Sequence, residues 1–273
     1  MMNKEGFVKH KKAYVLYINE TYIDVAKGCI NSIKEFSKLP ILVYMLNSDL
    51  ELNIDGVTTI KWECDIQTTK FDISNSNHYI DRDDNKIYKL LIQRPLIVKH
   101  ALENFAEVIA YVDSDSVASP YIDSIFSYYD TDALYPYFTE GIYEWMHING
   151  RGGAESMDDL STTLEHPICE LFSINQYVRR KYIQTGYFVA GPNTIDFLEE
   201  WYWMCINPKV FKNFSWYAPF HEETVANALL WKYEYHNSLP YIYVNGSLEE
   251  IDDIYTKVTF NGRKQSIRNW FNI

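Results

Sequence analysis

Residues 107–115 read EVIAYVDSD, an apolar run that ends on two aspartates separated by one serine. A continuous apolar run of this length is typical of a strand buried on both faces of a parallel sheet. Residues i and i+2 of an extended segment point the same way, so Asp113 and Asp115 present their carboxylates together. Like charges this close repel each other unless a cation lies beside them. Two oxygen ligands on one face suit a hard divalent cation that also keeps waters and phosphate oxygens, so we predict a Mn²⁺ or Mg²⁺ site here.

A simpler interpretation of the same residues stays open. Aspartate and serine are common in turns that follow a strand, and both carboxylates would then only be solvated. D-x-D also occurs often by chance, so the surrounding pattern has to decide.

The chain before this motif alternates between strand and helix patterns. Continuous apolar runs predict strands, and apolar residues at intervals of three and four predict helices. We expect a helix over Lys86–Phe105 that kinks or restarts at Pro95, because proline disrupts a helix interior. The earlier expected elements are strands at 13–19, 41–46 and 56–62 and a helix at 22–37. This alternation predicts an α/β fold with a mixed sheet flanked by helices.

The second half of the chain is more irregular. Strands are expected at 132–138, 182–192 and 239–246, and helices at 195–204 and 221–235. A glycine-containing stretch at 148–159 is long for a loop, and such loops are often functional, so we expect a lid over Gly150–Asp159. Neither a repeat nor a linker is evident, and we predict one domain with a nucleotide-binding half, 13–118, and an acceptor-binding half, 119–273.

Charge and cysteine content narrow the function classes. The chain has 25 Lys and Arg against 37 Asp and Glu, a formal net charge of −12, which argues against nucleic-acid binding because that needs a basic face. The four cysteines form no C-x-x-C pair, so buried reduced thiols are expected rather than a zinc ribbon. The basic first residues precede an apolar run, 13–18, that is too short to span a membrane, and we expect a cytoplasmic protein without a transmembrane segment.

Two families carry an aspartate pair in this setting. Phosphatases of the haloacid dehalogenase type use D-x-D-x-[TV] after an apolar strand, and Asp113 to Val117 fits that pattern, with Asp113 as nucleophile. That motif normally opens its fold, whereas here a strand-helix-strand unit precedes it. Over roughly residues 13–231 the chain more closely resembles retaining glycosyltransferases of the GT-A fold, of the glycogenin and lipopolysaccharide galactosyltransferase type.

The resemblance implies a nucleotide site in the first half. INETYIDV resembles the segment in which an acidic residue and a tyrosine close over the uracil ring, and KIYKLLIQRPLIV resembles the helix that brings basic residues toward the nucleotide. YVDSDSV matches the motif that holds the metal against the diphosphate. The implied nucleotide contacts are Asn19, Glu20, Tyr22, Lys86, Arg94 and Ser114, and the implied metal ligands are Asp113 and Asp115.

The second half carries two further matches. TGYFVAG resembles the family's Y-F-N-[AS]-G segment, with Val189 in place of asparagine, and it places Gly186 at the nucleotide sugar. HEETVANALLW resembles an acidic stretch that opens a helix. Glu222 or Glu223 would act as general base in an inverting enzyme or stabilise charge at the anomeric carbon in a retaining one. Acidic residues are also favoured at a helix start by the dipole alone, and that interpretation stays open.

One departure concerns the last segment. The family carries H-x-x-G-x-K-P-W, whose histidine completes the metal site, whereas residues 260–273 here contain Gly262, Arg263 and Lys264 but no histidine. The third protein ligand is therefore left open, and Lys264 or Arg263 is expected to pair with the diphosphate, as a point charge or as a fork.

The resemblance implies a metal-dependent glycosyltransferase that uses a nucleotide diphosphate sugar, with UDP as the expected nucleotide. The acceptor would be a glycan, a lipid-linked sugar or a protein. Two alternatives remain at this point: the phosphatase, and a non-catalytic GT-A-like domain that binds a nucleotide sugar or glycan.

Overall fold

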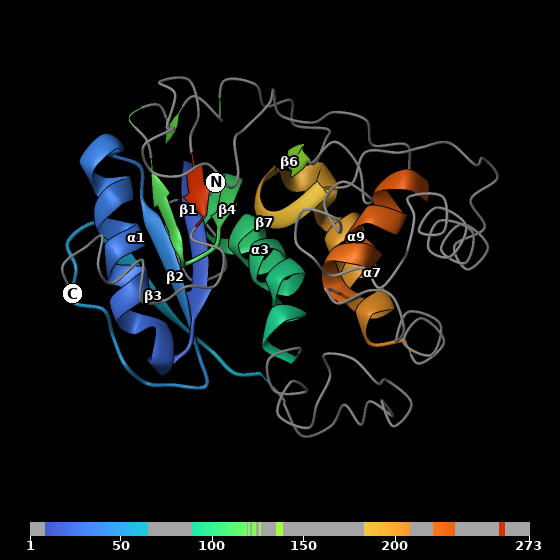
Figure 1. Cartoon of the computed structure of the whole chain (residues 1–273), viewed down its shortest axis with the longest axis horizontal. Helices are drawn as coiled ribbons and strands as arrows, with labels where there is room; N and C mark the ends of the chain where they lie inside the picture. The colour runs from blue at the N-terminus through green and yellow to red at the C-terminus, as the bar shows by residue number, and fades with distance from the viewer. Residues whose placement is uncertain are drawn as a thin grey trace, which may run out of the picture.

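A six-stranded sheet in the order β3-β2-β1-β4-β7-β6 forms the core (Figure 1). The computed structural model describes residues 9–64, 89–118, 120, 122–123, 126, 135–138, 183–207, 221–232 and 257–259. The strands are β1 (His10–Ile18), β2 (Ile41–Leu46), β3 (Val57–Trp62), β4 (Ala106–Val112), β5 (Ser116–Ala118), β6 (Tyr135–Phe138), β7 (Ile183–Ala190) and β8 (Lys257–Thr259). The helices are α1 (Ile23–Phe36), α3 (Gln93–Asn104), α7 (Ile195–Cys205) and α9 (His221–Lys232), and short 3-10 turns are η1 (Glu20–Tyr22) and η4 (Pro192–Thr194).

The strands β3, β2, β1 and β4 are parallel to one another, and the pairs β4–β7 and β7–β6 are antiparallel. β1 pairs with β2 on one side and with β4 on the other, so the strand order reverses between β1 and β4. β7 runs antiparallel to β4, and β6 runs antiparallel to β7. In open α/β sheets the point where strand order reverses leaves a crevice beyond the carboxyl ends of the strands. Here that crevice lies beyond Ile18 and Val112.

One face of the sheet is covered by α1 (Figure 1). Ala26, Cys29, Ile30 and Ile33 recur at helical spacing on α1 and are all buried. They pack against alternate residues of the strands, which include Tyr14, Leu16, Val43, Ala110 and Val112. We call this the α1 face.

The other face is covered by α3, α7 and α9, of which α3 packs against α7 and α7 packs against α9 (Figure 1). The intervening strand residues point to this side, among them Val15, Tyr44, Ile109, Tyr111 and Phe188. Aromatic rings continue through it from Tyr111 to Phe188, with centroids 5.2 Å apart, and from Phe188 to Trp201 of α7, 5.9 Å apart. We call this the α3 face.

A small antiparallel sheet of β5 and β8 lies directly after the aspartate motif. Ser116 pairs with Thr259, so the chain near residue 259 runs beside the residue that follows Asp115. This brings a segment from near the end of the sequence to the predicted metal ligands.

The α/β fold and its mixed, helix-flanked sheet are confirmed. The strand at 41–46 has the predicted bounds. Residues 89–91 are helical, the helix breaks at Ile92 and α3 restarts at Gln93. Pro95 therefore stands in the first turn of α3, where its missing N–H leaves no intrahelical bond unmade.

Some predicted features lie outside the described residues. These are the strand at 239–246 and the proposed lid at Gly150–Asp159. Cys29, Cys64 and Cys205 are buried and not disulfide-bonded, as expected, and burial raises the pKa of the Cys64 thiol to about 12. Among the helices that the structure describes, none combines the length and the apolar character needed to cross a membrane.

Candidate functional site

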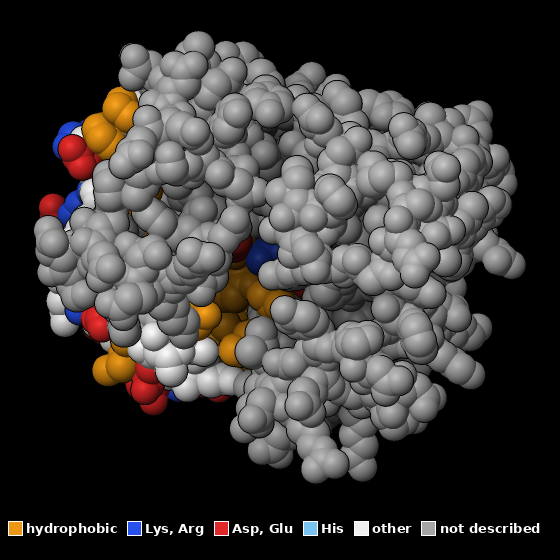
Figure 2. Space-filling model, in the orientation of Figure 1, with side chains coloured by type: hydrophobic (Ala, Val, Ile, Leu, Met, Phe, Trp, Pro, Cys, Tyr) orange, Lys and Arg blue, Asp and Glu red, His pale blue; other side chains and the backbone are white. Residues whose placement is uncertain are grey.

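A pocket of about 370 Å³ opens where the strand order reverses. Hydrophobic side chains gather in a hollow near the middle of the face in Figure 2, with basic and acidic side chains beside them. The lining residues are Tyr17, Ile18, Asn19, Thr21, Tyr22, Leu46, Leu90, Leu91, Arg94, Tyr111, Asp113, Ser114 and Asp115. Most of them follow β1 or β4 or belong to the residues around the start of α3.

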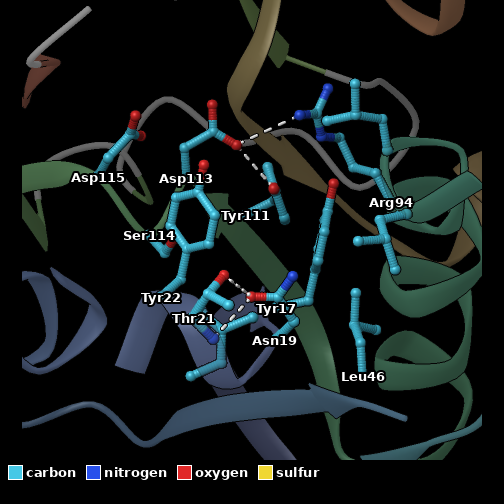
Figure 3. Close-up of a pocket in the computed structure, with 13 residues that line it drawn as sticks. Tyr17, Asn19, Thr21, Tyr22, Leu46, Arg94, Tyr111, Asp113, Ser114 and Asp115 are labelled. Atoms are coloured by element: carbon cyan, nitrogen blue, oxygen red, sulfur yellow. Dashed lines mark hydrogen bonds and ion pairs between the residues drawn. The ribbon is translucent and has the colours of Figure 1, made fainter. Parts of the chain in front are cut away.

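The end of the pocket beside β1 is aromatic and amide-bearing. The Asn19 side chain caps η1: its Oδ1 accepts from the Thr21 N–H at 3.1 Å and from the Thr21 hydroxyl at 2.7 Å. Because both bonds use the oxygen, the amide nitrogen points away from Thr21 into the pocket (Figure 3). Tyr17 and Tyr22 stand on either side of this amide. This end offers flat rings and a hydrogen-bond donor.

The end of the pocket beside β4 carries the two carboxylates. Asp113 and Asp115 are both half-buried, and both line the pocket (Figure 3). The Asp113 N–H donates to the Gly186 carbonyl at 2.8 Å, so pairing with β7 continues one residue beyond β4. Asp113 Oδ1 accepts from the Tyr111 hydroxyl at 2.7 Å and from Arg94 Nη2 at 3.3 Å.

Arg94 connects the pocket to a buried acidic cluster. Its side chain is 5% exposed and its guanidinium Cζ lies 5.2 Å from the centre of the Tyr111 ring. Nη1 donates to the Thr185 hydroxyl and lies 3.4 Å from Glu222 Oε1. Burial alone would lower the pKa of Arg94, but the surrounding tyrosine and carboxylate groups raise it above its ordinary value, so the guanidinium stays charged.

Glu222 and Glu223 stand in the first turn of α9 and are buried. The Thr185 N–H donates to Glu223 Oε2 at 3.0 Å, and the Trp201 indole donates to the Glu222 carbonyl oxygen at 2.6 Å. Burial raises the pKa of Glu222, and Arg94 partly opposes that shift. Glu222 thus contacts Arg94, which lines the pocket, but is not itself a lining residue.

Six of the predicted site residues come together in the pocket. They are Asn19, Tyr22, Arg94, Asp113, Ser114 and Asp115. Gly186 contacts Asp113 through its carbonyl oxygen. Glu20 is exposed, and its Oε1 accepts from the Ser48 hydroxyl at 2.7 Å instead of lining the pocket. Lys86 and Lys264 lie outside the described residues.

Sequence reasoning missed two tyrosines of the pocket, Tyr17 and Tyr111. Both lie inside strands, where a tyrosine is usually a core residue. A usable signal was present: Tyr17 is two residues before Asn19, and Tyr111 is two residues before Asp113. Because side chains alternate along a strand, each points to the same side as the polar residue that follows its strand.

The two carboxylates fit a divalent cation that takes its remaining ligands from elsewhere. Magnesium-type ions commonly use one or two carboxylates together with water and substrate phosphate oxygens. Within the described residues, no group of three or more histidine, cysteine, aspartate or glutamate side chains is arranged to hold a metal.

No protein-family model and no curated protein sequence matches this chain. The structure is similar to the apo form of the bifunctional glycosyltransferase WbbM, with 10% identity and a TM-score of 0.44, over 82% of this chain. This chain spans 38% of the length of WbbM. It is also similar to the galactosyltransferase LgtC in complex with donor and acceptor sugar analogs, with 10% identity and a TM-score of 0.45, over 80% of this chain and 70% of that one.

Proposed function

We propose that this protein is a glycosyltransferase of the GT-A fold that uses a divalent cation and transfers a sugar from a nucleotide diphosphate. The observation that carries the proposal is the pocket at the strand-order reversal. It combines aromatic rings and an amide donor at one end with two carboxylates at the other. A nucleoside diphosphate has a matching arrangement. Its flat base suits the aromatic end of the pocket, and its charged diphosphate suits a cation held by the two carboxylates.

Each end of the pocket then has a role. Tyr17 and Tyr22 would stack on the base, and the Asn19 amide would donate to one of its carbonyl oxygens, which favours a uracil nucleotide. Asp113 and Asp115 would hold Mn²⁺ or Mg²⁺. When bound, the cation neutralises charge on the diphosphate leaving group. Arg94 lines the same end and supplies a fixed positive charge beside Asp113.

The sugar and acceptor side would be formed by residues 186–191, in the second half of β7 and just after it, and by residues 221–227, which open α9. Gly186 lies next to Asp113, at the place where the donor sugar would project from the diphosphate. Glu222 and Glu223 remain candidates for the catalytic residues. Because Glu222 contacts Arg94, and Arg94 lines the pocket, we assign Glu222 the role of orienting that guanidinium.

A contact from Lys264 to the diphosphate belongs to the same proposal. β8 ends at Thr259 beside Ser116, and Lys264 follows five residues later in the sequence. Five residues of extended chain reach at most roughly 18 Å, which is enough to return to the neighbouring carboxylates. The acceptor itself would be a glycan, a lipid-linked sugar or a protein.

The test is calorimetric titration of UDP, GDP and CDP into the protein, each with and without Mn²⁺. We expect one nucleotide, UDP, to bind only in the presence of the metal. Asp115→Asn should abolish this binding without loss of stability, because it removes a charge next to Asp113. Asp55→Asn is the matched control, since Asp55 is exposed and precedes the edge strand β3, whereas the pocket lies beyond the carboxyl ends of the central strands β1 and β4.

Other outcomes point to other functions. If no nucleotide binds with metal, the transferase proposal fails, and hydrolysis of a generic phosphate ester tests the phosphatase alternative. If Asp115→Asn unfolds the protein while nucleotide binding to the wild type is independent of metal, Asp115 is a structural residue. Metal-dependent binding without transfer or hydrolysis would indicate a binding domain.

A further inference from the structure

The Asp113 carboxylate is held on one side by two donors of different kinds. The neutral Tyr111 hydroxyl donates at 2.7 Å, and the cationic Arg94 Nη2 lies at 3.3 Å. Both reach the same oxygen, Oδ1 (Figure 3). The shorter of the two contacts belongs to the tyrosine.

The Tyr111 ring is itself fixed from three directions. It stacks between Tyr17, with centroids 5.9 Å apart and planes at 30°, and Phe188, at 5.2 Å and 29°. The Arg94 guanidinium lies over the ring, and the side chain is 1% exposed. A hydroxyl on a ring clamped in this way cannot follow Asp113 if the carboxylate turns. The Tyr111 hydroxyl is therefore a hydrogen-bond donor at a fixed position beside Asp113.

The aspartate needs such a fixed donor. Its main chain is set by the bond to Gly186, but the final torsion of an aspartate is broad and its carboxylate turns easily. Hydrogen bonds behind metal-binding side chains remove this freedom, and their loss typically lowers metal affinity 10- to 100-fold. We propose that Tyr111 is a positioning residue for the cation site: its hydroxyl holds Asp113 in the orientation that binds the divalent cation. This inference rests on the proposed function.

The α1 face offers a matched contact without this role. Tyr14 is also buried on a central strand, and its hydroxyl donates to a carboxylate oxygen of Asp123 at the same distance, 2.7 Å. Asp123 does not line the pocket. Loss of either hydroxyl removes one tyrosine–carboxylate hydrogen bond, so the two substitutions share that cost. The Tyr111 hydroxyl also contacts the Tyr17 side chain, and of the two carboxylates only Asp113 lines the pocket.

The experiment compares Tyr111→Phe with Tyr14→Phe in the full chain. Binding of Mn²⁺ alone is followed by electron paramagnetic resonance of the free ion, with no nucleotide present, and thermal unfolding is recorded for each protein. We expect Tyr111→Phe to bind Mn²⁺ about 10- to 100-fold more weakly than wild type. Tyr14→Phe should bind it as wild type does, and the two variants should have similar unfolding temperatures.

Two results separate the inference from the function on which it rests. If the wild type binds Mn²⁺ and Tyr111→Phe binds it equally well, the positioning role is overturned and the metal site stands. If neither the wild type nor Tyr14→Phe binds Mn²⁺, the metal site itself fails. If Tyr111→Phe lowers the unfolding temperature more than Tyr14→Phe does, weaker binding could come from lost stability alone. The electron paramagnetic resonance spectrum of Mn²⁺ bound to Tyr111→Phe at saturating metal then tests the positioning role. An unchanged spectrum contradicts the positioning role, and an altered one supports it.

Discussion

Both faces of the sheet are covered by helices and hold a buried core, but they differ in what they bury. The described α1 face is filled almost wholly by apolar side chains. The α3 face also buries Arg94, Thr185, Glu222 and Glu223, which join into one polar cluster that ends at Asp113. A core does not need such a cluster, because replacing a buried ion pair with apolar side chains is often neutral or stabilising. We infer that the α3 face keeps these charged groups for their position next to the pocket and not for their contribution to stability.

The largest expected effect comes from breaking the cluster. Arg94→Met leaves Glu222 and Asp113 without their cation, and removing one partner of a buried pair typically costs about 3–5 kcal/mol of unfolding free energy. Urea unfolding measures this loss. A second substitution in the same chain, Glu222→Met, should restore most of it, because the buried charge then disappears too. If Arg94→Met is as stable as wild type, the cluster carries no such cost.

A cavity on the α1 face should affect stability alone. Ile30→Ala removes a fully buried side chain from α1 and should lower the unfolding free energy by about 2–5 kcal/mol. Calorimetry at a temperature where the variant is folded should then give wild-type nucleotide affinity in the presence of Mn²⁺. A fall in nucleotide affinity would show that packing on the α1 face also affects the pocket.

The smallest effect concerns pH. Burial raises the pKa of Glu222 in the folded state, so that state keeps its proton at pH values where the unfolded chain has lost it. The contribution of Glu222 to the free energy of unfolding is largest below the unfolded pKa of about 4.3. It decreases as the pH rises toward and through the pKa of the folded state. Glu222→Gln cannot ionise, so the stability difference between variant and wild type should shift in favour of the variant above that pH. Chemical unfolding of both proteins between pH 4 and 7, in steps of about half a unit, measures the shift; a constant difference would contradict it.

Local patterns predicted the strands of the six-stranded sheet and the aspartate pair, but not the three-residue strands β5 and β8. The run ILVYML has no polar residue and forms β2 over those six positions, and EVIAYVDSD places Asp113 and Asp115 at a strand end, as expected. These features depend on neighbours within one segment.

The polar cluster could not be predicted in this way. Arg94 and Glu222 are separated by 128 residues, so nothing near Glu222 in the sequence indicates that a guanidinium will cover it. Acidic residues at a helix start are normally exposed, and these two are buried. Likewise, the turn of Glu20 toward Ser48 depends on a partner from another loop. Pairings of this kind arise only when the chain has folded.

Helix α1 contacts the segment that carries Asp113 and Asp115, and these contacts affect the conformational entropy of that segment. The Ser32 hydroxyl oxygen accepts from the Ala118 N–H at 2.9 Å, and the Cys29 thiol lies 3.7 Å from the Asp113 carbonyl oxygen. The segment that carries both carboxylates is thus tied at each end to one helix. Its conformational freedom is lost when the protein folds and not when a ligand arrives, which is the meaning of preorganisation. A ligand at this site would therefore meet a segment that needs little further ordering.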